Sequence, residues 1–131
     1  MTPETTVFLL TLGLGLVHLA IGAIARAFEV DLPTLLGSRD DLPPRKNLYG
    51  IRGERANHNF KETLPWALGL LILVQVTDNA NAISAIGAWT YFGGRAVYLP
   101  IYVFGVPIVR SIAFVTSMVG LATIVSQIVS L

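Results

Sequence analysis

One stretch of this chain joins a charged segment directly to an apolar one, and this junction limits what the chain can fold into. Residues 64–76 contain no charged side chain, whereas residues 50–63 contain five. A membrane-spanning helix needs roughly 20 mainly apolar residues, so residues 64–76 are too short to cross a bilayer alone. We therefore predict one long helix that continues back to about Arg52 and carries charged side chains into the membrane.

The polar side chains of this helix fall on one stripe. At about 100° per residue, spacings of three and four place the following residues on one face: Arg52, Arg55, Asn59, Glu62 and Trp66. A charged side chain at the centre of a membrane helix costs roughly 2.5 to 3.5 kcal/mol, so we expect the stripe to face protein or water. The residues leave two interpretations open, a structural ion network between helices and a binding site for a polar ligand.

The composition is that of an integral membrane protein. Hydrophobic residues make up 53% of the 131-residue chain and charged residues 13%, against about 25% charged residues in soluble domains. A net charge of +1 without a basic run argues against a nucleic-acid partner. The absence of cysteine excludes disulfides and cysteine-based metal centres. No metal site is predicted, because His18 and His58 lie on different predicted helices without an acidic partner at ligand spacing.

The pattern predicts a single all-α membrane domain built as a four-transmembrane-helix bundle. The helices are expected at about residues 5–28, 50–77, 80–104 and 107–130, running up, down, up and down. Residues 28–49 are predicted to form an irregular loop, because Asp31 and Pro33 are among several residues there that interrupt helices. We interpret His18 as a hydrogen-bonded packing residue and Arg26 as a side chain that reaches the membrane surface.

The loops that carry lysine and arginine lie on one predicted side of the membrane. By the positive-inside rule both termini face outward, and the polar half of the second helix faces the cytoplasm. Arg55, Arg95 and Arg110 from three helices then reach one depth, which predicts an anion-binding cavity.

The third predicted helix carries its own polar face. Tyr91, Arg95, Tyr98 and Tyr102 follow one another at spacings of four, three and four, so they share one side of the helix. An aromatic belt at the membrane surface is the alternative interpretation of Tyr98 and Tyr102.

Two motifs carry a resemblance to a known family. The first is Arg55-Ala56-x-x-Asn59-x-x-Glu62, followed by Pro65. The second is Gly94-Arg95-x-x-Tyr98-x-x-x-Tyr102, followed by Pro107 and by Arg110-Ser111. With these motifs the whole chain resembles the MAPEG family, the membrane-associated proteins of eicosanoid and glutathione metabolism, and within it the bacterial-type members.

The resemblance implies a homotrimer that binds glutathione between neighbouring subunits. If the protein is bacterial, we expect it to be a multi-pass protein of the cytoplasmic (inner) membrane with the site facing the cytoplasm. It implies glutathione contacts at six positions: Arg55, Asn59, Glu62, Arg95, Tyr98 and Tyr102. It also implies that Arg110 is catalytic and stabilises the glutathione thiolate, which would attack an apolar electrophile or a lipid hydroperoxide.

Differences from the eicosanoid-producing members argue against leukotriene or prostaglandin synthesis, and they lie at Asn57, His58, Thr63 and Leu64. A noncatalytic membrane scaffold or lipid-binding protein remains the alternative to an enzyme. A small transporter is disfavoured, because Glu62, the one carboxylate that we place within a span, has arginines beside it.

Overall fold

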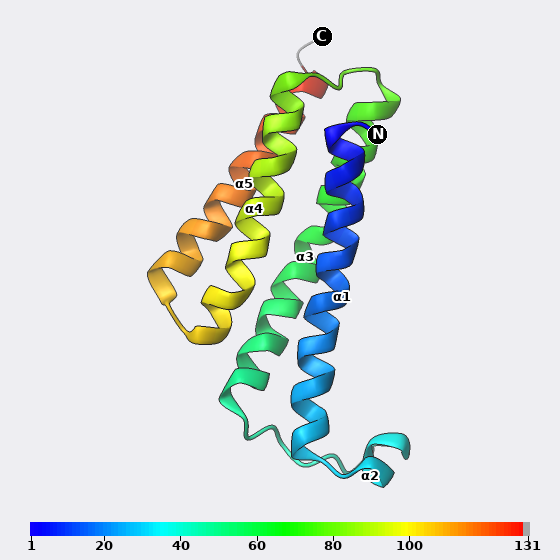
Figure 1. Ribbon diagram of the computed structural model, residues 1–131, viewed down its shortest axis with the longest axis vertical. Coiled ribbons are helices and arrows are strands. Elements are labelled where there is room, and N and C mark those ends of the chain that lie inside the picture. The colour runs from blue at the N-terminus through cyan, green and yellow to red at the C-terminus, as the bar shows by residue number, and fades with distance from the viewer. Residues whose placement is uncertain (130–131) are drawn as a thin grey trace.

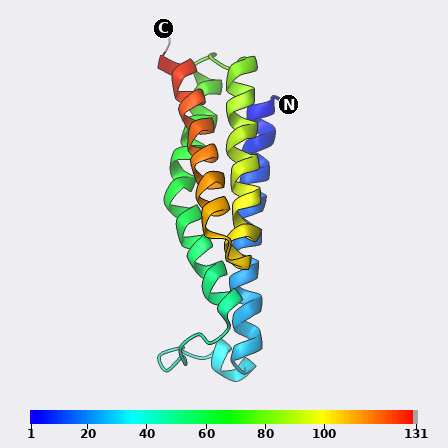
Figure 2. The same ribbon diagram turned by 90° about the vertical axis from the view of Figure 1, so that its left-hand side faces the viewer.

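The computed structural model describes residues 1–129 as four long helices and one short helix. Their bounds are α1 (Pro3–Glu29), α2 (Leu32–Leu36), α3 (Leu48–Val76), α4 (Ala82–Phe104) and α5 (Pro107–Val129). The long helices run in alternating directions, and the N-terminus and the end of α5 lie at the same end of the bundle (Figures 1 and 2). Each end of a long helix lies within two residues of its predicted position, except residue 130, which lies outside the described residues.

The helix α2 corrects the prediction that residues 28–49 form an irregular loop. Asp31 caps this helix, since its carboxylate accepts hydrogen bonds from the Thr34 amide at 3.2 Å and the Thr34 hydroxyl at 2.7 Å. Both bonds lower the pKa of the Asp31 carboxyl, and the bond from the Thr34 hydroxyl has the larger effect. Pro33 lies in the first turn, where the missing amide hydrogen has no helical partner to lose. The two residues that were interpreted as helix breakers therefore start a helix.

Several polar groups lie inside the helix bundle, and many large apolar groups lie on its outer surface. The buried polar residues are Glu4, Thr11, His18, Ser84, Arg95 and Ser117. By contrast, the side chain of Leu16 on α1 is 69% exposed and that of Ile72 on α3 is 49% exposed. This distribution is typical of a protein surrounded by lipid, where a leucine side chain can face the lipid but a charged side chain must be covered by protein. Helices α1 and α5 are each long and apolar enough to cross a membrane.

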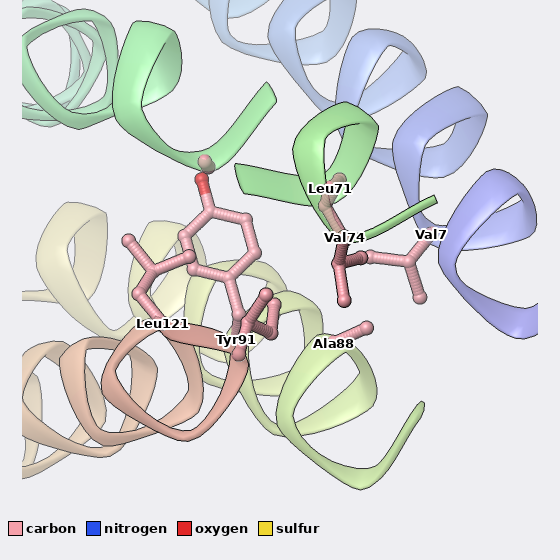
Figure 3. Close-up of a cluster of buried hydrophobic side chains, with 8 residues drawn as sticks. Val7, Leu71, Val74, Ala88, Tyr91 and Leu121 are labelled. Atoms are coloured by element: carbon pink, nitrogen blue, oxygen red, sulfur yellow. The ribbon is translucent and has the colours of Figure 1, made fainter. Parts of the chain in front are cut away.

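An apolar core fills the end of the bundle near the N-terminus. In Figure 3 Tyr91 extends from α4 toward α3, with Leu121 of α5 on one side and Val74 on the other. Beside this core the carboxylate of Glu4 on α1 is buried and accepts hydrogen bonds from Ser84 and from Gln75. The sequence interpretation missed Glu4 as a carboxylate within a helix. The hydrogen bonds of Glu4 join α1 to α3 and α4. They satisfy the buried carboxylate, which would otherwise be costly in this position.

The opposite end of α1 is tied to the start of α3. Glu29 accepts a hydrogen bond from the Lys46 amide at 2.9 Å and pairs with Arg26 at 3.3 Å. Arg45 also pairs with Glu54 of α3 at 2.8 Å. Arg26 therefore has a carboxylate partner in addition to the surface position that we predicted.

Deeper in this helix pair, His18 is buried, donates from Nδ1 to the Leu14 carbonyl at 2.8 Å, and stacks on Phe60, as expected for a packing residue.

Helices α4 and α5 pack closely because small residues line the seam between them. A Cβ atom added at Gly94 would lie 2.8 Å from the Ala113 carbonyl oxygen and 2.9 Å from the Ser117 Cβ atom. One added at Gly120 would lie 2.5 Å from the Tyr91 nitrogen. Close backbone approach of this kind replaces the hydrophobic effect as the source of helix association in lipid. It brings the polar face of α4 next to the first turns of α5.

We predict that Gly94→Ala destabilises the protein while Gly93→Ala does not. The added methyl group at position 94 meets the α5 backbone, whereas no atom lies within 4 Å of the equivalent position at Gly93. Overpacking of this kind costs about 1 to 3 kcal/mol of unfolding free energy. Thermal unfolding in mild detergent, followed by tryptophan fluorescence, measures the difference. Equal melting temperatures for the two variants would show that the seam is not tightly packed.

Candidate functional site

The guanidinium of Arg95 on α4 lies at the centre of the candidate site. The residue is completely buried, at 0% exposure. Its Nη1 donates to the Asn59 side-chain oxygen at 2.8 Å, and its Nη2 donates to the Thr63 hydroxyl at 2.6 Å. Its Cζ atom lies 5.4 Å from the ring centre of Tyr98 and 5.0 Å from that of Phe114. Arg95 therefore joins α3, α4 and α5.

The sequence sets up these contacts through helix spacing. Asn59 and Thr63 are four residues apart on α3, so their side chains lie one above the other and face the same guanidinium. Tyr98 follows Arg95 by three residues on α4, which places its ring beside the guanidinium. A buried charge without partners would be very costly, so these hydrogen bonds and ring contacts make the burial possible.

Next to Arg95 is a cleft of about 170 Å³ between α3, α4 and α5. It is lined by Asn59, Tyr98, Arg110, Ser111, Phe114 and Val115. The half-buried Arg110 has its Cζ atom 4.6 Å from the ring centre of Tyr102, and the Tyr102 and Tyr98 rings are 5.5 Å apart. The structure therefore groups five of the seven residues suggested by the sequence: Asn59, Arg95, Tyr98, Tyr102 and Arg110. Tyr98 is 4% exposed, which does not fit an aromatic belt at the membrane surface.

The two remaining residues, Arg55 and Glu62, lie on the exposed side of α3. Glu62 is 3.7 Å from His58, with both side chains largely exposed, and among residues 1–129 neither an ion pair nor a hydrogen bond joins Glu62 to Arg55. Trp66 is likewise exposed, at 71%. The stripe, which we expected to face protein or water, is therefore divided: Asn59 faces Arg95 inside the bundle, whereas Arg55, Glu62 and Trp66 lie on the exposed side of α3.

The geometry of a helix explains why the stripe divides. The buried face of α3 is centred on Ala56, Phe60 and Ala67. At about 100° per residue, Arg55 and Glu62 are rotated by roughly 100° or more from this centre, whereas Asn59 is rotated less. Asn59 therefore reaches Arg95. Its two neighbours on the stripe, Arg55 and Glu62, lie outside the lining of the cleft, on the exposed side of α3, and we call them the outer rim.

Sequence reasoning missed four residues of the site: Thr63, Ser111, Phe114 and Val115. Thr63 had been considered only as a difference from related sequences, although its position four residues after Asn59 predicts a shared face. Phe114 and Ser111 come from α5, and their approach to α4 depends on the small-residue seam. Ser111 follows Arg110 directly and was noted only as part of a motif. Helical periodicity contained a signal for Thr63 but none for Phe114.

An apolar groove of about 530 Å³ adjoins the cleft along α5. Its lining is Pro107, Ile108, Arg110, Ser111, Ile112, Val115 and Thr116. Arg110, Ser111 and Val115 line both the groove and the cleft, so the two hollows meet at these side chains. A polar group in the cleft and an apolar group in the groove would therefore come together beside the Arg110 guanidinium.

The electrostatics of the cleft favour an anion. Among residues 1–129 no carboxylate forms an ion pair with Arg110 or with Arg95. Arginine keeps its charge even when partly buried, and its planar group of donors suits carboxylates and other anions. The hydroxyl of Tyr98 and the amide of Asn59 add neutral hydrogen-bonding groups to the same cleft.

Comparison with known families identifies the origin of this arrangement. The sequence profile of the MAPEG family matches residues 5–130, which is nearly the whole chain. The chain belongs to the MAPEG family. The match covers both motifs, so the residues that line the cleft lie within the MAPEG region. No curated protein and no solved structure matches the chain.

We predict that Thr63→Val lowers the stability of this MAPEG protein. The substitution keeps the shape of the side chain but removes the acceptor of the 2.6 Å bond from Arg95, so a buried guanidinium loses a partner. Such a loss costs about 1 to 3 kcal/mol of unfolding free energy. Thermal unfolding in detergent measures the effect.

Thr116→Val is the matched control, because the Thr116 hydroxyl is exposed and, among residues 1–129, bonds only within its own helix, to the Ile112 carbonyl at 2.9 Å. The control is expected to unfold near the wild-type temperature. If Thr63→Val unfolds there too, then Arg95 does not depend on its partners on α3.

Proposed function

We propose that this protein is a glutathione-dependent membrane transferase or peroxidase that acts on apolar electrophiles or lipid hydroperoxides. The observation that carries the proposal is the position of Arg110, which lines both a polar cleft and an apolar groove. A thiol bound in the cleft and a lipophilic acceptor in the groove would meet at its guanidinium. Membership of the MAPEG family, which includes glutathione-related transferases and peroxidases, supports this assignment.

The side chains present suit the chemistry of glutathione, which carries two carboxylates, one ammonium group and one thiol. Arg55 on the exposed rim can pair with a carboxylate, and Glu62 can pair with the ammonium group. Asn59 and the tyrosine hydroxyls can bind the peptide groups. Arg95 is fully buried and already bonded to Asn59, so in this proposal it holds the Asn59 amide in place for the ligand.

The reaction follows from the state of the thiol. An ordinary thiol is mostly protonated at neutral pH, and a neighbouring guanidinium favours the thiolate, which is the attacking form. In the transferase reaction the thiolate sulfur forms a bond to an electrophilic carbon and the leaving group departs with its electron pair. In the peroxidase reaction the thiolate sulfur attacks the terminal hydroperoxide oxygen and the O–O bond breaks. The alkoxide takes up a proton and leaves as an alcohol, and glutathione sulfenic acid remains. A second glutathione then condenses with the sulfenic acid to give glutathione disulfide and water.

The openness of the site supports an assembly of several copies of the chain, and the family resemblance implies that this assembly is a homotrimer. The cleft holds about 170 Å³ and its rim residues Arg55 and Glu62 face outward, so one chain encloses only part of a tripeptide. A neighbouring copy would cover the rim and exclude water from the thiolate.

We propose that all four long helices span the cytoplasmic membrane, with the site near its cytoplasmic face, because the loops with most lysine and arginine lie at that end.

A noncatalytic lipid-binding scaffold is the second candidate, and the apolar groove along α5 is the observation that favours it. A lipid chain would fill the groove without any need for the neighbouring arginine. The two candidates differ in what they require of Arg110, so the test is directed at this residue.

We predict that Arg110→Ala keeps the assembly and the glutathione affinity near wild type but shifts the ionisation of the bound thiol. Loss of the guanidinium raises the pKa of the thiol toward the ordinary value of about 8.5. Thiolate absorbance in the ultraviolet, titrated against pH with glutathione bound, measures this shift.

The control is Arg39→Ala, since Arg39 lies in the loop after α2, is exposed, and bonds there to the Leu35 carbonyl. It is expected to titrate like wild type. A titration that is unchanged in Arg110→Ala, or the absence of a thiolate signal from wild type at neutral pH, would favour the scaffold. The former result would also allow Tyr98 or Tyr102 to stabilise the sulfur instead.

A further inference from the structure

Arg52 is a polar residue of α3 that the proposed reaction does not use, and it reaches the turn between α4 and α5. Its Nη1 donates to the Val103 carbonyl oxygen at 3.2 Å, across 51 residues of sequence. The Arg52 side chain is half-buried, and no carboxylate among residues 1–129 forms an ion pair with it. The contact therefore links the start of α3 to the last turn of α4.

The turn between α4 and α5 offers a hydrogen-bond acceptor to this guanidinium. The Val106 amide donates to the Ile101 carbonyl at 3.2 Å and the Gly105 amide donates to the Tyr102 carbonyl at 3.1 Å, which is the Schellman arrangement at a helix end. Within residues 1–129 this arrangement leaves the Val103 carbonyl without a backbone partner. Arg52 supplies the missing donor, and its positive charge suits the negative end of the α4 dipole.

Gly105 is required for the same contact. Its φ angle is +77°, which glycine adopts at no steric cost. A Cβ atom at this position would also lie 2.6 to 2.8 Å from three atoms of the Arg52 guanidinium. The glycine therefore allows both the left-handed turn and the close approach of the guanidinium.

The turn held by Arg52 carries two residues of the candidate site. Tyr102 lies in the last turn of α4, and Arg110 lies in the first turn of α5, where its amide donates to the Val106 carbonyl at 3.1 Å. The Arg110 guanidinium packs on the Tyr102 ring, with 4.6 Å between Cζ and the ring centre. A shift of the turn would move Arg110 relative to Asn59, because these two residues line the cleft from different helices.

We infer that Arg52 is a positioning residue that clamps the turn between α4 and α5 and thereby sets the place of Arg110 in the cleft. The clamp itself is a property of the fold, while its effect on the bound thiol rests on the proposed function. Rigid support of this kind is what a site needs to hold a charged group within a fraction of an ångström of its productive position.

Hydrogen exchange of residues 101–108, followed by mass spectrometry on the assembled protein in detergent without glutathione, tests the clamp. Arg52→Gln is expected to speed exchange in this segment about tenfold, because the charge-assisted bond that closes the turn is lost. Arg52→Lys, which keeps a cationic donor, should restore part of the protection. Lys61→Gln is the control, since Lys61 is exposed on the same helix and should leave exchange at the wild-type rate.

Exchange in the segment 84–92 of α4 serves as a folding check, because a general loss of structure would raise it as well. If Arg52→Gln leaves exchange in residues 101–108 at the wild-type rate, or raises it equally in both segments, the clamp is refuted. This measurement needs no ligand, so it tests the clamp independently of glutathione binding.

The thiolate titration then tests the effect on Arg110. In Arg52→Gln the pKa of the bound thiol is expected to rise in the same direction as in Arg110→Ala, by a smaller amount, and Arg52→Lys should reverse part of the rise. If exchange increases locally but the titration is unchanged, Arg52 holds the turn without positioning Arg110. If wild type gives no thiolate signal, the proposed function fails and the effect on the thiol fails with it.

Discussion

The buried guanidinium of Arg95 is the interaction on which the rest of this structure depends. It brings a charge into the interior of a bundle whose outer surface is largely apolar, and it bonds to Asn59 and Thr63 of a different helix. A charge in such surroundings restricts the positions of its neighbours, because every lost partner is expensive where water cannot replace it. The register between α3 and α4 is therefore fixed near the candidate site, and Asn59 is held at the cleft.

The polar groups of α3 divide into two sets with different tasks. Asn59 and Thr63 face inward and hold Arg95, and Arg52 reaches the end of α4. Arg55 and Glu62 face outward and are free to meet a ligand or a second copy of the chain. One helix thus supplies both the support of the site and its open rim. This division also explains how a helix of this MAPEG protein tolerates a charged stripe, since Arg52 and Asn59 of the stripe form hydrogen bonds within the chain.

Much of this arrangement could be predicted from the sequence, because helical spacing is a local property. The shared face of Arg95, Tyr98 and Tyr102 follows directly from spacings of three and four. The partners of Arg95 on α3 could not be predicted, since the register between two helices is set by packing and leaves no period in either sequence. The outward rotation of Arg55 became clear only once the buried face of α3 was known. The short helix α2 was missed because Asp31 and Pro33 occur both in turns and at helix starts.

We propose that this chain assembles with copies of itself around sites for glutathione. Native mass spectrometry of the protein released from mild detergent, over a series of glutathione concentrations, tests this assembly. We expect a trimer that takes up glutathione in a saturable way, to at most one molecule per chain. A monomer or dimer would contradict the shared site, and a trimer without saturable glutathione adducts would contradict the proposed function.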